Sequence, residues 1–543
     1  MIRTRHLLPA ILAIALVVRI WGLGFGLPDI DARPDETEIA GPAVGFLSGD
    51  LRPPFFQWPT LFTYTTALLY LMYFLVTRPF ANYATLAAFA ESRHQSVAPF
   101  LYITRSLSAV MGVLTVWWIY AICRRVFDRT VAIVAALFLA LAFLHVRDSH
   151  FGVTDVAMTA LVMLTVLALL KWRHTGKPLD VAAAGLAAGL AASTKYNGAI
   201  AVAPFLVALA QRLVDDRTTA GSDGAWTRAA QGALIFGAAF SIGFFGASPY
   251  ILIDWPRFVT DAIGVGAHFE SGHGVVLGRG WWYYARVVLP AAIGWPMYIA
   301  GVAGLLALLV TRLRATAVLL AFPIVYYVIA GRGYTVFARY IIPVVPFLCM
   351  SAAWLVVTAV RAVPQGTTPF ARGAVTAAIA LAIVAPTARK TLQLDRLLAT
   401  TDNRVVVARA LVDLLPLVDP VPSRSFLYQS GEKYGFAPMV IEGREVARVS
   451  RYNETTGRFD SGDPEWILLQ RSPLILYSSV PPRLDQLIHE RYTLVRRFPT
   501  RNDSADSIYD QQDAFYLPIG TLNGISRPGP AFDLYRRQDA PSR

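Results

Sequence analysis

The chain is poor in charged residues and in cysteine. Only 16% of its 543 residues are charged and 55% are hydrophobic, whereas an ordinary soluble protein has about 25% charged residues. The two cysteines, Cys123 and Cys349, lie far apart in separate apolar segments, so the sequence indicates no disulfide framework. These deficits exclude a disulfide-rich secreted module and predict a polytopic membrane protein.

Common catalytic signatures are missing as well. The sequence has no GxSxG, HExxH, Walker A or CxxC pattern, which removes support for serine hydrolase, zincin, P-loop ATPase and thiol redox chemistry. The net charge of +13 does not indicate a nucleic-acid surface, because Lys and Arg gather at the ends of apolar segments, where they act as topology signals. We expect a membrane as partner and no nucleic acid.

Eleven apolar stretches are long enough to cross a hydrocarbon core of about 30 Å, which takes about 17–25 helical residues. They lie near residues 7–27, 98–122, 129–147, 153–171, 179–194, 196–213, 229–248, 287–311, 315–330, 338–360 and 371–388. Arg3 and Arg5 precede the first stretch, as in a signal peptide, but no small-residue cleavage site follows it. We therefore expect a retained first helix and about 11 transmembrane helices.

A twelfth apolar stretch, 59–80, is ambiguous because it follows Pro53-Pro54 and begins at Trp58-Pro59. With Arg3 and Arg5 in the cytoplasm, eleven spans place the basic loops on the cytoplasmic side, whereas a twelfth span would move them outside. We therefore predict that this stretch lies in the membrane interface or re-enters. The same count places loops 28–97 and 249–286 on the external face.

The residues after 389 differ in composition from those before. Charges become frequent, and short β-prone runs bounded by Pro and Gly appear at 425–428, 466–469 and 474–477. We predict a transmembrane domain over 1–389 and a soluble α/β domain over 390–543 on the external face. The predicted fold class is thus a polytopic α-helical membrane protein with a C-terminal soluble α/β domain.

Polar and charged residues gather at the predicted external ends of the helices. Asp35 and Glu36 follow the first span, Arg147 and Asp155 bracket the turn between the third and fourth, Lys195 and Tyr196 lie between the fifth and sixth, and Arg339 precedes the tenth. An ionisable group within the apolar zone costs about 2.5–3.5 kcal/mol on insertion scales, so such groups usually line a cavity or a substrate path. We expect one outward-facing site.

The mixture of signs in this set is informative. An acidic pair with separate basic groups suits a reaction in which one partner loses a proton while the other departs as an anion such as phosphate, which Arg and Lys bind through charge-assisted hydrogen bonds. Glycosyl transfer from a lipid phosphate has this form. A carboxylate acting as general base contributes about 10²–10⁴ in rate, and the basic groups stabilise the departing phosphate.

Loop 249–286 contains two histidines with an acid between them. His268, Glu270 and His273 are candidate metal ligands, but their spacing is not that of a standard zinc site or facial triad. Hydrogen bonding of His273 to a substrate is the simpler interpretation. No metal-binding residue is assigned, no cofactor is certain, and a divalent metal stays open.

Seven short motifs together resemble one known group of enzymes. They are Pro34-Asp35-Glu36, Gln57-Trp58-Pro59-Thr60-Leu61, Arg105-Ser106-Leu107-Ser108, Arg147-Asp148-Ser149-His150 with Asp155, Ser193-Thr194-Lys195-Tyr196-Asn197-Gly198, Arg339-Tyr340 ahead of Pro343 and Pro346, and Tyr509-Asp510-Gln511-Gln512-Asp513-Ala514-Phe515-Tyr516. With these motifs in this order, the chain resembles the GT-C superfamily of membrane glycosyltransferases that use polyprenyl-phosphate sugars. The similar branch is the one shared by bacterial protein O-mannosyltransferases and the aminoarabinose transferase of lipid A.

The resemblance implies a GT-C-type fold, an inverting single displacement and an external acceptor, which is a protein, a lipid or an envelope glycan. It implies that Asp35 is catalytic, with Glu36 as the orienting or secondary acid. Lys195, Arg339 and Arg147 are expected to bind the donor phosphate, and we assign Asp155, Tyr196 and His273 to the substrate. It also implies the bacterial cytoplasmic membrane, with the site on the external face.

Two other classes of function stay open at this point. A transporter or flippase of lipid-linked sugars would bind the same headgroup, although the sequence shows neither the two related halves nor the mid-membrane breaks common in transporters. A non-catalytic scaffold for envelope assembly would use the tail for binding. The Trp-Trp-Asp signature of oligosaccharyltransferases is absent, since Tyr283 follows Trp281-Trp282, which disfavours transfer of a preassembled glycan to asparagine.

Overall fold

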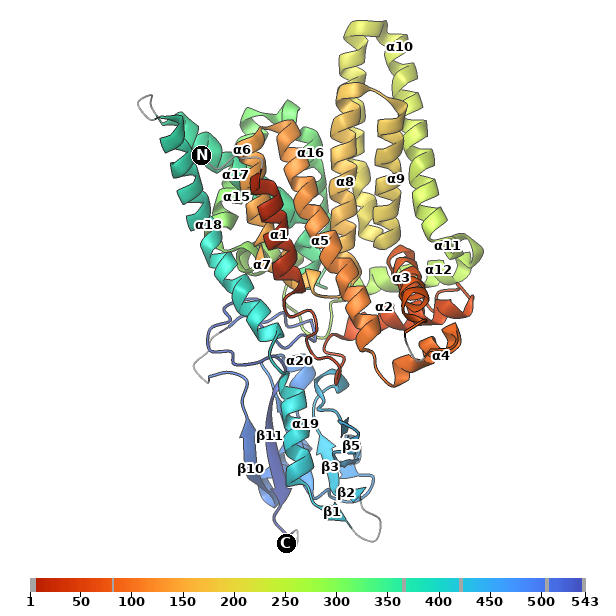
Figure 1. Cartoon of the computed structure of the whole chain (residues 1–543), viewed down its shortest axis with the longest axis vertical. Coiled ribbons are helices and arrows are strands. Elements are labelled where there is room, and N and C mark those ends of the chain that lie inside the picture. Colours follow the sequence, from red (N-terminus) through yellow and green to blue (C-terminus); the bar gives the residue numbers. More distant parts are fainter. Residues whose placement is uncertain (1–5, 81–82, 364–367, 419–422, 503–506, 540–543) are drawn as a thin grey trace. The chain divides into compact units, whose positions relative to one another are not determined.

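The computed structural model describes residues 6–80, 83–363, 368–418, 423–502 and 507–539, without the side chains of 219–221 (Figure 1). Arg3 and Arg5 lie outside the described residues. Two compact units make up the chain. The helical unit comprises Met1–Ile20, Glu38–Gln95 and Pro99–Leu392, and the mixed unit comprises Trp21–Thr37, Ser96–Ala98 and Gln393–Arg543. The predicted soluble domain began at residue 390, so it did not include Trp21–Thr37, which belong to the mixed unit.

Seven helices in the described part of the chain are long and apolar enough to cross a membrane. Three are single helices: α5 (Ala98–Val126), α8 (Thr154–Thr175) and α16 (Leu313–Ala330). Two are the arms of α10 (Val202–Ala247): the first arm, Tyr196–Thr218, begins with η4 (Tyr196–Ala201), and the second is Ser222–Ala247. The last two are η6 (Ala338–Val344) with α17 (Val345–Ala362), and α18 (Pro369–Leu398) with α19 (Asn403–Leu414). Figure 1 shows the two arms of α10 running antiparallel. The chain is a multi-span membrane protein.

Two further spans are broken helices. α6 (Arg129–Ala140) and α7 (Phe143–Ser149) are bent by 58°, and the run Gly280–Ile293, made of α13 (Gly280–Tyr283), η5 (Tyr284–Val288) and α14 (Leu289–Ile293), is bent by 119° against α15 (Trp295–Thr311). Up to nine spans result within the described ranges. The shorter apolar helices are α1 (Leu7–Ile20), α3 (Leu61–Thr77) and α9 (Pro178–Thr194), and the other short helices are α2 (Pro34–Gly45), α4 (Leu86–Glu91), α11 (Tyr250–Ile253) and α12 (Trp255–Ser271).

Each of the eleven predicted stretches contains a helix, although the first, predicted over 7–27, is helical only as far as Ile20. Nine of them satisfy the length and composition of a span when each bent pair counts as one, while α1 and α9 have 14 and 17 residues. The fold class predicted from the sequence, a polytopic helical protein with a sheet-containing C-terminal region, is confirmed. The ambiguous stretch forms α3, a helix of 17 residues, and its place in the interface stays a prediction.

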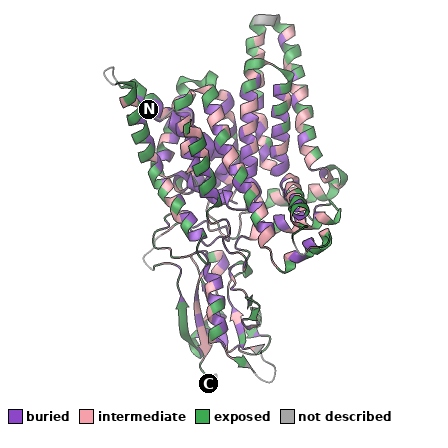
Figure 2. Ribbon diagram, viewed as in Figure 1, coloured by how far each residue is buried: buried purple, intermediate pink, exposed green. Residues whose placement is uncertain are grey.

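Burial in the helical unit follows the pattern of a protein surrounded by lipid. Val17 of α1, Leu234 of α10 and Leu381 of α18 are exposed, whereas Thr104 and Arg105 of α5 are buried (Figure 2). Apolar side chains on the outside suit a hydrocarbon surround. Polar side chains inside a helical bundle usually face a cavity or one another.

Small residues bring α9 and α10 into close contact. Gly185 and Gly189 are four residues apart on α9, and a Cβ added at either would collide with a carbonyl oxygen of α10, that of Phe236 or Phe240. A small-xxx-small pattern lets two membrane helices approach closely enough for backbone packing. The same helix ends at Thr194, so this packing sets the position of Lys195, which follows directly.

Gly189→Ile is expected to destabilise the helical unit, because the added side chain meets backbone that has little freedom to move. Overpacking of this kind costs about 1–3 kcal/mol. The matched control is Gly237→Ile on α10, where an added Cβ meets nothing within 4 Å. The thermal unfolding midpoint in detergent should fall clearly for the first variant and hardly for the second. Equal midpoints would show that the α9–α10 contact is not tightly packed.

The mixed unit is built on a five-stranded sheet. Its strands are β3 (Phe426–Gln429), β6 (Arg448–Val449), β9 (Trp466–Arg471), β10 (Tyr492–Phe498) and β11 (Ala531–Arg537), in the order β10-β11-β9-β3-β6. β11 is antiparallel to both β10 and β9, and β3 is parallel to both β9 and β6. Ile467 and Leu469 of β9 pack on Leu484 and Ile488 of α21 (Pro482–Arg491).

Three short ribbons complete the described strands of this unit: β1 (Leu417–Val418) with β2 (Ser423–Arg424), β4 (Val440–Ile441) with β5 (Arg444–Glu445), and β7 (Tyr452–Asn453) with β8 (Arg458–Phe459). The runs 425–428 and 466–469 lie on β3 and β9 as predicted. The run 474–477 was wrongly predicted as β-prone, since it contributes to the one-turn helix α20 (Ile475–Ser478). The Ser472 hydroxyl accepts the N–H of Leu474 and closes a turn there, which a strand would not allow.

Candidate active site

The first group of predicted site residues surrounds Asp155 in the first turn of α8. This carboxylate is buried, and its Oδ1 accepts a hydrogen bond of 2.5 Å from the Lys195 Nζ, while its Oδ2 lies 4.0 Å from the Arg339 Nε. A helix N-terminus favours a negative charge, so the N-terminus of α8 stabilises the carboxylate in its first turn. Lys195 comes from the end of α9 and Arg339 from η6. We call Asp155, Lys195, Arg339 and Tyr340 the Asp155 cluster.

Aromatic rings hold the two cations of this cluster. The Lys195 ammonium lies 4.4 Å from the centre of the Tyr340 ring, and the Arg339 guanidinium lies 4.3 Å from that of Phe337. Cations over aromatic faces gain about 0.5–2 kcal/mol, more when they are shielded from water. The Tyr326 hydroxyl donates to the backbone oxygen of Tyr340 at 2.8 Å, which fixes the segment that carries the ring.

The Asp155 cluster carries excess positive charge. One carboxylate and two cations give a formal sum of −1 + 2 = +1. The Asp155 carboxylate and the aromatic rings orient the two cations. A phosphodiester, with a single negative charge, matches this excess.

His273 joins the same aromatic layer. Its ring lies 5.1 Å from that of Phe337, which also contacts Arg339, and 5.2 Å from the ring of His268. Tyr196 is oriented differently, since its hydroxyl donates to the backbone oxygen of Phe56 at 2.9 Å. The structure therefore brings His273 to the ring that supports Arg339 and commits the Tyr196 hydroxyl to loop 28–97.

The described residues contain no group of three or more His, Cys, Asp or Glu side chains that could hold a metal ion. Glu270, which lies between the two histidines in sequence, pairs with Arg332 at 2.7 Å. The Glu270 carboxylate is therefore engaged by an arginine.

Arg147 lies on the short helix α7 beyond the break in the third predicted span. Its Nη1 is 3.6 Å from Asp148 Oδ2, both side chains are buried, and the guanidinium lies 5.4 Å from the centre of the Phe151 ring. The break turns α7 by 58° against α6. The position of Arg147 therefore depends on what stabilises this break.

Arg19 of α1 is the residue that stabilises the break, and the sequence analysis missed it. Its guanidinium is fully buried and donates to the backbone oxygens of Leu139 (3.4 Å) and Ala140 (3.1 Å) at the end of α6. Its Nη2 also lies 3.0 Å from Nδ1 of His145 on α7. The last carbonyls of a helix need donors from outside. An arginine inside an otherwise apolar span was the signal that could have revealed this role.

Asp35 and Glu36 belong to the mixed unit and lie in the first turn of α2. The Asp35 side chain is 36% exposed and its Oδ2 is 3.5 Å from Arg33 Nη2, whereas Glu36 is fully buried. The carboxylate of Asp35 is therefore accessible to a reactant, and that of Glu36 is confined within the protein. The division into a reacting and an orienting acid stays a prediction.

The tail holds Arg33 in place. Arg33 is fully buried, pairs with Asp513 and lies 5.9 Å from the centre of the Phe515 ring. Burial raises the pKa of the neighbouring Tyr516 to about 12, so this phenol stays neutral near pH 7. The tail motif 509–516 is thus a structural partner of the segment that carries Asp35.

Comparison with known proteins finds one matching family model and several solved structures with a similar fold. Residues 102–242 match the family described as dolichyl-phosphate-mannose-protein mannosyltransferase. The apo crystal structure of an oligosaccharyltransferase from Archaeoglobus fulgidus is 12% identical, with a TM-score of 0.53 over 98% of this chain and 88% of that chain. Apo ArnT from Cupriavidus metallidurans is 14% identical, with a TM-score of 0.50 over 97% of each chain.

A third similar structure is the oligosaccharyltransferase AglB from Archaeoglobus fulgidus in complex with an inhibitory peptide and a dolichol-phosphate. It is 14% identical, with a TM-score of 0.50 over 84% of this chain and 66% of that chain. No curated protein sequence is significantly similar to the chain. At these identities the likeness to the solved structures is one of fold.

Proposed function

We propose that this multi-span membrane protein is a glycosyltransferase of the GT-C superfamily and that it moves a sugar from a polyprenyl-phosphate-linked donor to an external acceptor, with inversion. The acceptor is a protein, a lipid or a cell-envelope glycan, and the enzyme works at the outer face of a bacterial cytoplasmic membrane. A lipid-phosphate donor is supported by the description of the matching family and by the dolichol-phosphate bound to the archaeal relative.

The Asp155 cluster carries this proposal. Lys195 and Arg339 are rigidly held, and their net charge with Asp155 is +1. A polyprenyl-phosphate sugar has one negative charge on its phosphodiester. During transfer the phosphate gains further negative charge as the bond to the sugar breaks, so the same cations stabilise the transition state more than the bound donor.

In the proposed reaction the acceptor oxygen forms a bond to the anomeric carbon while the bond from that carbon to the phosphate oxygen breaks. The electron pair of the breaking bond leaves with the lipid phosphate, toward Lys195 and Arg339. Asp35 takes the proton of the acceptor late, once the new bond is forming. Glu36 and Arg33 are positioning residues for Asp35.

The other predicted site residues have supporting roles in this proposal. Arg147 is a further phosphate-binding cation, and His273 donates a hydrogen bond to the donor from beside Phe337. Tyr196 acts on the substrate through its ring, because its hydroxyl donates a hydrogen bond to the backbone oxygen of Phe56.

One assay separates the proposed function from its alternatives. Purified protein is reconstituted in liposomes with radiolabelled polyprenyl-phosphate hexose and a crude envelope fraction as acceptor. Label that moves from the lipid into the acceptor supports a transferase. Label that crosses the bilayer while still attached to lipid identifies a flippase, and label that does neither identifies a scaffold. Either of the last two outcomes would overturn the proposal.

A further inference from the structure

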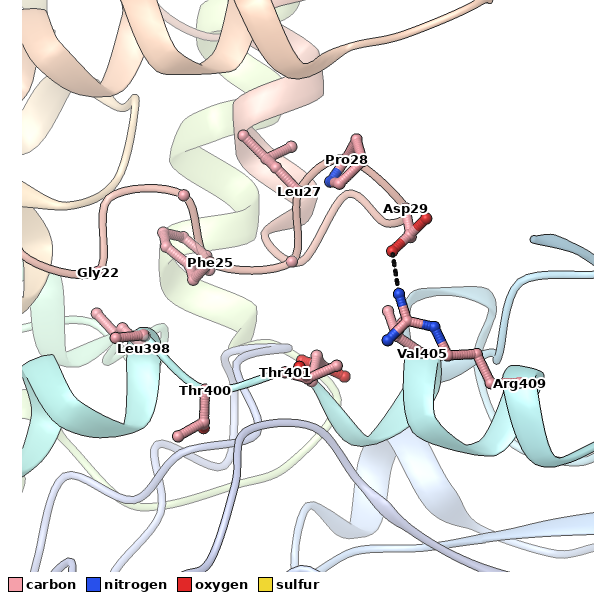
Figure 3. Close-up of a pocket in the computed structure, with 14 residues that line it drawn as sticks. Gly22, Phe25, Leu27, Pro28, Asp29, Leu398, Thr400, Thr401, Val405 and Arg409 are labelled. Carbon is pink, nitrogen blue, oxygen red and sulfur yellow. Dashed lines mark ion pairs between the residues drawn. The ribbon is translucent and has the colours of Figure 1, made fainter. Parts of the chain in front are cut away.

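The mixed unit contains a cavity of about 290 Å³ that none of the roles above uses. It lies between loop 22–29, which follows α1 in sequence, and the junction of α18 and α19, including Thr400, Thr401 and Arg409 (Figure 3). Ligand pockets generally measure about 300–1,000 Å³. The cavity therefore suits a small ligand.

Some of the polar groups that line this cavity have unused hydrogen-bonding capacity within the described ranges. The Asp29 carboxylate lies 3.9 Å from Arg409 Nη2, which is beyond hydrogen-bond distance. Figure 3 shows the two groups pointing toward one another across the edge of the cavity. Within the described ranges neither the Asp29 carboxylate nor the Thr401 hydroxyl makes a hydrogen bond, and Arg409 uses its Nε on Glu442 at 3.0 Å. Acceptors and donors thus remain available to a ligand.

The walls of the cavity are fixed by packing. Gly22 has a positive φ of 86°, and a Cβ there would lie 2.7 Å from that of Leu398 and 3.0 Å from the backbone oxygen of Asp395. Only glycine allows the loop to lie so close to the end of α18. On the other wall, Asp402 caps α19 and pairs with the buried Arg404 at 2.8 Å. A preformed pocket loses little entropy when it binds a ligand.

The charge of the cavity selects the class of ligand. Arg409 pairs with both Asp29 and Glu442, so these three groups carry a formal charge of −1, and Asp402 is neutralised by Arg404. No excess positive charge is present to attract a phosphate, in contrast to the Asp155 cluster. A neutral polyol fits better, because one of its hydroxyls can donate to a carboxylate while its neighbour accepts from a guanidinium.

We propose that this cavity binds a neutral saccharide unit, with Asp29, Arg409 and Thr401 as its polar contacts. Vicinal hydroxyls of one sugar ring would fill the gap between Asp29 and Arg409. Backbone hydrogen bonds of 3.0 Å, from the Phe25 N–H to the Gly22 oxygen and from the Leu27 N–H to the Gly24 oxygen, fix the loop that forms this wall. This site goes beyond the proposed transfer reaction and does not depend on it.

Saturation-transfer NMR on the full-length protein tests the site. The protein is kept in a detergent without a sugar headgroup, and the probes are methyl α-mannopyranoside, methyl β-glucopyranoside and inorganic phosphate. We expect saturable binding of at least one glycoside, weakened at least tenfold by Asp29→Ala and by Thr401→Val. The matched control is Asp413→Asn, on the exposed face of α19 and outside the cavity, which should bind as the wild type does.

Three results would overturn the proposal. They are the absence of saturable binding of either glycoside, binding that both cavity variants leave unchanged, and binding of phosphate displaced by neither glycoside. Thr401 is exposed, so Thr401→Val keeps the test valid if Asp29→Ala does not fold. Because the readout is binding, a failure here is distinct from a failure of the transferase assay.

Discussion

Replacing Asp35 by Asn is expected to reduce sugar transfer by about 10²–10⁴, the range that general-base catalysis supplies. The amide keeps the size of the carboxylate and its place in the first turn of α2, but it cannot take the acceptor proton. The loss should appear in kcat and not in the KM for the lipid donor, because Asp35 acts on the acceptor proton. Initial rates of label transfer from the lipid donor give both constants.

Asp50→Asn is the matched control for this variant. Asp50 is also exposed and lies in the same predicted loop, where its carboxylate accepts the backbone N–H of Arg52 at 3.0 Å. Its amide variant should transfer sugar at the wild-type rate. Full activity of Asp35→Asn, in protein that elutes as the wild type does, would remove Asp35 from the mechanism and leave the GT-C fold untouched.

Replacing Lys195 by Met is expected to lower kcat/KM by about 10²–10³, the loss typical when one donor to a developing negative charge is removed. Methionine has a length similar to that of lysine and no charge, so the Asp155 cluster changes from a net charge of +1 to zero. Both binding of the donor phosphate and stabilisation of the leaving group should weaken. Lys177→Met, at the exposed N-cap of the same helix, should leave the rate unchanged.

A double variant separates loss of function from loss of stability. Breaking a buried ion pair by removing one partner costs about 3–5 kcal/mol when the remaining charge is uncompensated, although Arg339 lies 4.0 Å from Asp155 and reduces this cost. Lys195→Met with Asp155→Asn removes both charges and should recover much of the unfolding midpoint, but not the activity. Recovery of the activity as well would show that the pair is only structural.

Hydropathy along the chain was sufficient to predict the helical, multi-span class of the fold and the approximate positions of its apolar helices. A span is a local property of about 20 consecutive residues, which is why nine of the eleven stretches form helices long and apolar enough to span when each bent pair counts as one. Charges at helix ends are equally local. Asp155, Lys195 and Arg339 were predicted, with Asp35, Glu36 and Arg147, to share one site, and the fold brings these first three together.

The remaining features depend on contacts between distant residues, and local patterns do not report such contacts. Arg33 pairs with Asp513, which is 480 positions away, and Arg19 stabilises a helix end about 120 positions away. The cavity beside Asp29 exists only because loop 22–29 lies against residues near 400. Helices follow from the free energy of burying apolar side chains in a membrane, whereas these pairings follow from the need of each buried charge and carbonyl for a partner.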